Sequence, residues 1–75
     1  MARSSPEWAK KAKGYLKAEM ARDGIRNAEL ARRLTAMGVP ETADSVRVKL
    51  QRGVFPAWFL LAALKALGVE TLRLE

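Results

Sequence analysis

The side chains in this chain that could do chemistry are mostly cations. The 75 residues include 14 Lys and Arg and 8 Asp and Glu, but neither His nor Cys. This composition excludes imidazole acid–base catalysis, thiol nucleophiles, disulfides and the usual zinc ligands. Without a phosphate-cradling glycine loop, eight carboxylates offer little from which to build a catalytic site. We therefore expect no enzyme, no metal, no cofactor and no small-molecule ligand.

The positive charge is concentrated in the first part of the chain. The net charge is +6, with seven basic and three acidic groups in residues 1–26, five and three in 27–53, and two of each in 54–75. Lys10, Lys13 and Lys17 share one face of an expected helix. A basic excess of this size suits nucleic acid or an anionic membrane surface. The alternative for the lysine row is an ordinary solvated face.

Nothing in the sequence indicates a membrane or a secreted protein. No apolar segment follows the N-terminal lysines as it does in a secretion signal. The longest apolar run, residues 54–64, is too short to cross a bilayer. We expect a cytoplasmic protein, associated with the nucleoid if it binds DNA.

Four glycines divide the chain at intervals of about fifteen residues. Gly24, Gly38, Gly53 and Gly68 each follow a segment with helical periodicity, and glycine commonly ends helices. The pattern predicts a single all-α domain over residues 1–75, with four to five helices. Residues 1–4 are expected to be a disordered N-terminus, and residues 69–75 a short extended tail.

Capping residues predict where the first three helices begin. The first begins near Ser5 with Pro6 in its first turn, although Ser4 and Glu7 could form a capping box instead. The second is expected over residues 28–37 with Asn27 as its cap, and the third over residues 43–52 with Thr42 as its cap.

Apolar spacing predicts which side chains these helices bury. One face of the first helix carries Trp8, Ala12, Tyr15, Leu16 and Met20. The second helix has a stripe of Leu30, Ala31, Leu34 and Met37. In the third, Ala43, Val46 and Leu50 share a face, Arg47 and Lys49 lie at its flanks, and the opposite face carries Asp44, Ser45, Val48, Gln51 and Arg52.

The expected fourth helix, residues 56–67, has no polar face. Such a helix is either central in the core or partly exposed as a subunit interface. The interface alternative predicts a homodimer through Trp58, Leu61 and Ala62, with Leu72 and Leu74 of the tail.

Three segments together resemble lambda-repressor-like and Cro-like helix-turn-helix domains. Residues 24–31, with the Leu30–Ala31 pair, are similar to the start of the helix-turn-helix, and residues 50–53 to the end of its third helix. Residues 60–69 are similar to the fourth helix and the following turn. The chain also resembles a small bacterial family related to that fold. It departs from the pattern at Arg26, where a Ser or Thr cap is usual, and at Arg47, where an aliphatic residue is usual and Val46 precedes it by one position.

The resemblance implies double-stranded DNA as the partner and the third helix as the reader of the major groove. Implied base contacts are Asn27, Ser45, Arg47, Val48, Gln51 and Arg52. Implied phosphate contacts are Lys10, Lys13, Lys17, Arg33, Thr42 and Lys49. Arg pairs with guanine and Gln with adenine through two hydrogen bonds, and ammonium or guanidinium groups release counterions from phosphates.

We therefore expect a homodimeric transcriptional regulator that binds specific duplex sequences. The alternative is a protein-interaction module that keeps the fold without the DNA contacts. A peptide-like protein of membrane surfaces is less consistent with the caps, turns and core pattern.

Overall fold

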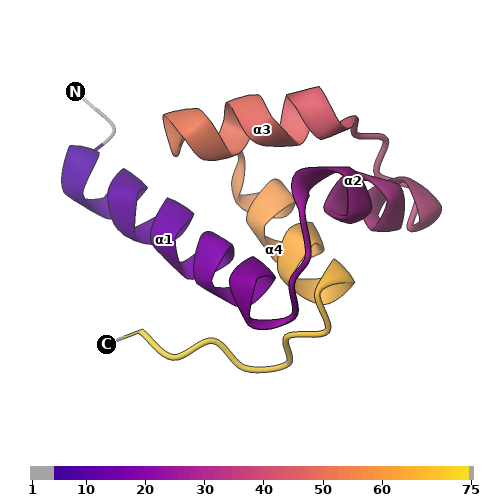
Figure 1. The fold of residues 1–75 in the computed structure, drawn as a ribbon. Helices are drawn as coiled ribbons and strands as arrows, with labels where there is room; N and C mark the ends of the chain where they lie inside the picture. Colours follow the sequence, from indigo (N-terminus) through magenta and orange to yellow (C-terminus); the bar gives the residue numbers. More distant parts are fainter. Residues whose placement is uncertain (1–4, 75) are drawn as a thin grey trace.

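The computed structural model describes residues 5–74, which form four helices and no strand. The helices are α1 (Pro6–Arg22), α2 (Asn27–Ala36), α3 (Ala43–Arg52) and α4 (Ala57–Ala66). In Figure 1, α1 and α3 draw apart toward α2, and α4 lies behind them. The described residues confirm the prediction of an all-α chain with four to five helices. The predicted disordered N-terminus, residues 1–4, and the last residue of the tail lie outside the described residues.

Two of the predicted helix caps are present. The backbone N–H of Trp8 donates to Ser5 Oγ at 3.4 Å, and Pro6 is the first residue of α1. Thr42 and Ser45 form a reciprocal capping box at the start of α3, with N···O distances of 3.0 and 2.9 Å. Such a cap satisfies amide groups that a helix leaves without partners.

The predicted cap of the second helix is wrong. Asn27 is the first residue of α2, and Arg26 is its N-cap, with no side-chain hydrogen bond to the helix. A guanidinium carries donors only, so Arg26 cannot accept from the free amides of the first turn. The start of α2 is therefore left without a side-chain cap.

All four helices contribute to one core. Its side chains with no exposed surface are Leu16, Leu30, Leu34, Val46, Phe59 and Ala63. Three predicted members of buried faces are exposed, of which two are Met37, at 44%, and Ala43 in the first turn of α3. Met37 follows the last residue of α2, and Gly38 with φ 91° ends the helix there. Trp8 of α1 is also exposed, at 60%.

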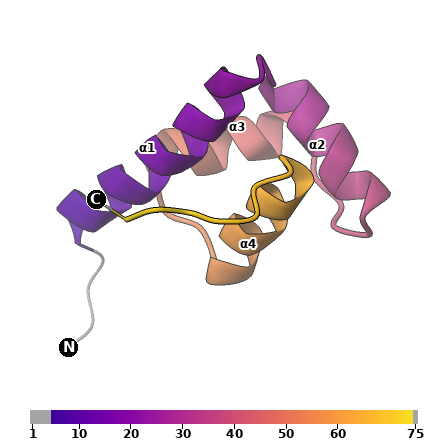
Figure 2. The same ribbon diagram turned by 90° about the horizontal axis from the view of Figure 1, so that it is seen from below.

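Helix α4 lies at the surface rather than at the centre of the core. It buries Phe59, Ala63 and Leu64, whereas Trp58 and Leu61 are 55% and 68% exposed. The expectation that α4 could be buried on both sides is therefore wrong. Figure 2 shows the tail running back beside α4 and α1 without regular secondary structure through residue 74, in agreement with the predicted extended tail.

No helix in the described part of the chain is long and apolar enough to cross a membrane.

Candidate nucleic-acid interface

A hollow of about 310 Å³ lies where α1, the start of α2 and α3 meet. Lys13 and Lys17 come from α1, Asn27 from α2, and Arg47 and Gln51 from α3; Leu50 completes the lining. In Figure 1 this region lies between the diverging helices α1 and α3. The structure thus brings together five of the residues that the sequence assigned to DNA contacts.

A second hollow continues the first one toward the α1–α2 turn. It shares Lys17, Asn27 and Leu50 with the first and adds Ile25 and Arg26. Arg26 is exposed. Sequence reasoning missed it as a site residue, because it was considered only as a departure from a capping pattern. Its place immediately before the N-terminus of α2 was the available signal.

The outward face of α3 carries a line of three bonded side chains. Arg47 donates from Nε and Nη2 to Asp44 Oδ1, at 3.1 and 2.6 Å, and from Nη1 to Gln51 Oε1 at 3.0 Å. Lys13 Nζ of α1 donates to the carbonyl oxygen of Gln51 at 3.4 Å. The helical wheel predicted Arg47 at the flank of this face. The hydrogen bonds place it at the centre instead.

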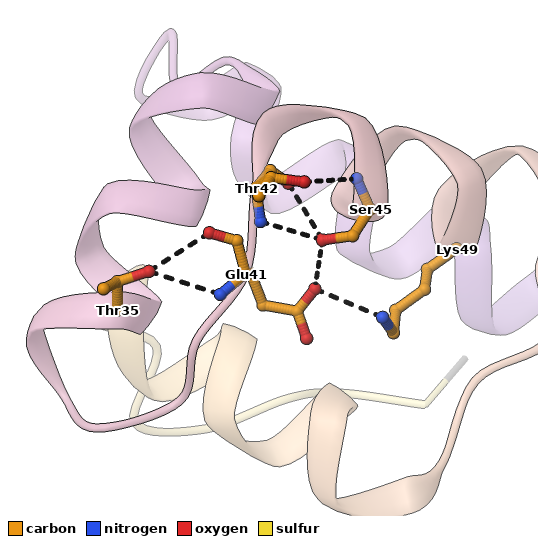
Figure 3. A network of polar contacts seen from close by, with 5 residues as sticks. All are labelled: Thr35, Glu41, Thr42, Ser45 and Lys49. Carbon is orange, nitrogen blue, oxygen red and sulfur yellow. Dashed lines mark hydrogen bonds and ion pairs between the residues drawn. The ribbon is translucent and has the colours of Figure 1, made fainter.

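The other side of α3 faces inward, toward a buried carboxylate. Glu41, in the α2–α3 turn, has a side chain that is only 4% exposed. Its Oε1 accepts from Ser45 Oγ at 2.5 Å and from Lys49 Nζ at 3.2 Å (Figure 3). Lys49 Nζ also lies 5.3 Å from the centre of the Phe59 ring. Ser45 is therefore not on the outward face with Asp44, which corrects the helical-wheel prediction.

The same network fixes the turn between α2 and α3. Thr35 Oγ1 donates to the carbonyl oxygen of Glu41 at 3.1 Å and lies 3.2 Å from the backbone nitrogen of Glu41, which donates to it. Thr42 is held in the capping box, so Thr42, Ser45 and Lys49 all make contacts within the protein (Figure 3). The structure does not bring these three predicted DNA contacts to the hollow.

Arg33, another predicted phosphate contact, connects two helices. It donates from Nε to Glu29 Oε2 at 2.9 Å and from Nη1 to the carbonyl oxygen of Ala66 in α4 at 3.2 Å. Arg32 donates twice to the Glu29 carboxylate, at 2.9 and 2.7 Å. These hydrogen bonds, those of Arg32 first, lower the pKa of Glu29 from 4.5 to about 2.

The remaining predicted contacts differ in exposure. Lys10 and Arg52 are exposed, and Val48 is half-buried. We define the basic face by its six cations: Lys10, Lys13, Lys17, Arg26, Arg47 and Arg52. Asp44 is the carboxylate that lies among them on α3.

A second exposed surface is apolar. Trp58 and Leu61 project from α4, and a groove of about 320 Å³ between α1 and the start of α4 is lined by Trp8, Val54, Ala57 and Leu60 among others. Of the other predicted dimer residues, Leu74 is 71% exposed, whereas Ala62 and Leu72 are half-buried and pack against the core. We call Trp8, Val54, Trp58 and Leu61 the apolar face.

The described residues hold no group of acidic side chains that could bind a metal ion. Neither a curated protein nor a solved structure matches this chain. Residues 8–72 match the model of a family described as "Domain of unknown function (DUF6471)". This match covers all six cations of the basic face and all four residues of the apolar face. The chain therefore belongs to this domain family of unknown function.

Proposed function

We propose that the basic face binds double-stranded DNA. The observation that carries the proposal is the convergence of cations from α1 and α3 around one hollow, with Arg26 at the adjoining hollow. Lys13 and Lys17 of α1 lie beside Asn27 of α2 and Arg47 of α3. Neutralising phosphates with such cations releases counterions, which is the main source of sequence-independent affinity for DNA.

The exposed side of α3 suits a reader of the major groove. That groove admits one α-helix, and side-chain donors on the helix can reach the edges of base pairs. Arg47 and Gln51 project from this side, with Val48 and Arg52 beside them. The arrangement is consistent with the resemblance to helix-turn-helix domains, in which the third helix has this role.

The start of α2 adds a second feature that favours an anion. The N-cap Arg26 makes no side-chain hydrogen bond to the helix, so the first amide groups of α2 stay available. Helix N-termini with free amides attract phosphate. Because Asn27 also lines the hollow, a DNA phosphate near α2 would be close to Lys17 as well.

The proposed set of contacts is narrower than the one expected from the sequence. Base contacts are assigned to Asn27, Arg47, Val48, Gln51 and Arg52, and phosphate contacts to Lys10, Lys13, Lys17 and Arg26. Thr42, Ser45, Lys49 and Arg33 are assigned to holding the helices together, because each makes hydrogen bonds within the protein.

We further propose that the protein acts as a homodimeric transcriptional regulator in the cytoplasm, at the nucleoid. The apolar face supports the dimer. From their exposed fractions, its four side chains present about 500 Å². A standard protein interface buries about 800 Å² on each partner, so this face would supply most of the area that a second copy needs.

The proposal is tested by fluorescence anisotropy with a labelled random-sequence duplex at 50 and 200 mM salt. Each phosphate contact contributes about 0.9 to the slope of log affinity against log salt. Raising the salt from 50 to 200 mM lowers the affinity of each protein by some factor. For the double variant Lys13→Ala/Lys17→Ala this factor should be about 12 times smaller than for wild type. Lys11→Ala/Lys65→Ala removes the same charge outside the basic face and should keep the wild-type slope.

Failure of the wild type to bind at 50 mM salt would refute DNA binding. The specific observation that then favours the second candidate, a protein-interaction module, is the exposure of Trp58 and Leu61 on α4. In that case a polar substitution at these two positions would abolish binding of the partner protein.

A further inference from the structure

Asp44 is a carboxylate placed directly against the main candidate for base recognition. Its Oδ1 accepts two hydrogen bonds from Arg47, and the Asp44 side chain is 75% exposed. An exposed ion pair of this kind contributes little to folding stability. It also lowers the positive charge of the surface proposed to meet DNA. Asp44 also lies in the first turn of α3, where a carboxylate interacts favourably with the helix dipole.

The hydrogen bonds leave Arg47 with a limited set of free donors. A guanidinium has five N–H groups. Two donate to Asp44 Oδ1 and one donates to Gln51 Oε1, so two remain for another acceptor. Two donors are what a guanine requires, because its O6 and N7 accept a pair of hydrogen bonds in the major groove.

The charge of Asp44 also separates guanine from phosphate. A phosphate bound to Arg47 would bring a negative charge next to the Asp44 carboxylate, and like charges at this range repel. Guanine O6 and N7 are neutral acceptors, so the Asp44 carboxylate does not repel them in this way. The second oxygen of Asp44 is in addition a suitable acceptor for the N4 amino group of a cytosine.

We propose that Asp44 is a specificity-determining residue that positions Arg47 for guanine and disfavours its contact with phosphate. Gln51 supports the same guanidinium from the next turn of α3. Recognition by α3 then requires a G·C pair opposite Arg47. This inference rests on the proposed DNA binding and names the base that the surface selects.

The test compares wild type with Asp44→Ala in two measurements. The first is selection of preferred sites from a library of random duplexes. The second is anisotropy with the random-sequence duplex at 50 and 200 mM salt. Without Asp44, Arg47 becomes free to contact phosphate, so the salt slope should rise by about 0.9 and the loss of affinity between the two salts by about 3.5-fold. The selected guanine should disappear from the preferred site.

Two control variants separate this effect from charge and folding. Glu70→Ala makes the same change in net charge on the exposed segment after α4, and it should leave both slope and site preference unchanged. Asp44→Asn keeps an acceptor oxygen for Arg47 without the charge, so it should retain part of the guanine preference while its slope rises. Circular dichroism confirms that each variant is helical.

The outcomes distinguish the two levels of the argument. A wild type that does not bind at 50 mM salt overturns DNA binding and this inference with it. A wild type that binds, with an Asp44→Ala variant of unchanged slope and site preference, overturns only the role of Asp44. If Asp44 has a purely structural role, Asp44→Ala will lower the affinity for every duplex equally. That result would also overturn the proposed role of Asp44.

Discussion

The contact between Gly53 and α1 gives a prediction whose size follows from the geometry. Gly53 is the buried C-cap of α3 and has φ 71°. A Cβ atom at this position would lie 3.1 Å from the carbonyl oxygen of Ala9 and 3.6 Å from Lys13 Cβ. Alanine in this conformation costs about 1–2 kcal/mol. The backbone of α1 would also have to move, because a carbonyl group cannot rotate away as a flexible side chain can.

Gly68 provides a matched control for the contact. Its φ is 78°, but a Cβ atom there would meet nothing within 4 Å. Alanine at either position also lowers the entropy of the unfolded chain. This effect stabilises the folded protein by about 0.4–1 kcal/mol and offsets part of the conformational cost. We expect Gly68→Ala to reduce the free energy of unfolding by about 1 kcal/mol, and Gly53→Ala by about 2–3 kcal/mol once the displacement of α1 is included.

The assay is thermal and urea unfolding followed by far-UV circular dichroism. For a domain of this size, 1 kcal/mol corresponds to a shift of about 4–8 °C in Tm. The conformational cost of alanine is common to both variants. The difference between their losses of unfolding free energy therefore measures the cost of displacing α1 from Gly53. Equal shifts for Gly53→Ala and Gly68→Ala would show that α1 does not rest on Gly53, and the reasoning would fail.

Three further predictions concern the other contacts. Glu41→Gln should lower the free energy of unfolding by about 1–3 kcal/mol in urea titrations, because it weakens the buried acceptor of Lys49; a change near zero would contradict this. The folded-state pKa of Glu29 lies at about 2, below its ordinary 4.5, so the stability it contributes is present above pH 4.5 and is lost as the pH falls toward 2. The Tm of wild type should therefore fall over this interval more than that of Glu29→Gln, and parallel curves would refute the link. Replacing Trp58 and Leu61 by Ser should convert a dimer into a monomer in light scattering, and a wild type that is already monomeric would refute the dimer.

The helix boundaries were predictable because their signals are local. Thr42 caps α3 within three residues of its partner Ser45, and Gly38 and Gly53 adopt the positive φ that ends a helix. Such contacts depend on a few neighbouring residues, so sequence spacing contains them. The cap of α2 was assigned one residue late because Asn27 has a good capping side chain, whereas the backbone places Arg26 there.

The inward turn of Ser45 and Lys49 could not be predicted in the same way. It depends on the burial of Glu41, which lies outside any helix and reaches Lys49 eight residues away. Nothing in the sequence spacing indicates that a turn carboxylate is only 4% exposed. The sequence left open whether Trp58 is buried or exposed, since periodicity describes the faces of a helix but not which of two apolar faces the other helices cover.

The burial of Val46 explains why Arg47 faces outward. Val46 has no exposed surface, and successive residues of a helix are about 100° apart around its axis. Burying Arg47 instead would place an ionised guanidinium in the core, at a large cost in solvation. With Val46 in the core, Asp44, Arg47 and Gln51 form one exposed line along α3, and Lys49 lies against Glu41. The choice of residue 46 for the core therefore determines both the inner network and the side chains that α3 presents at the hollow.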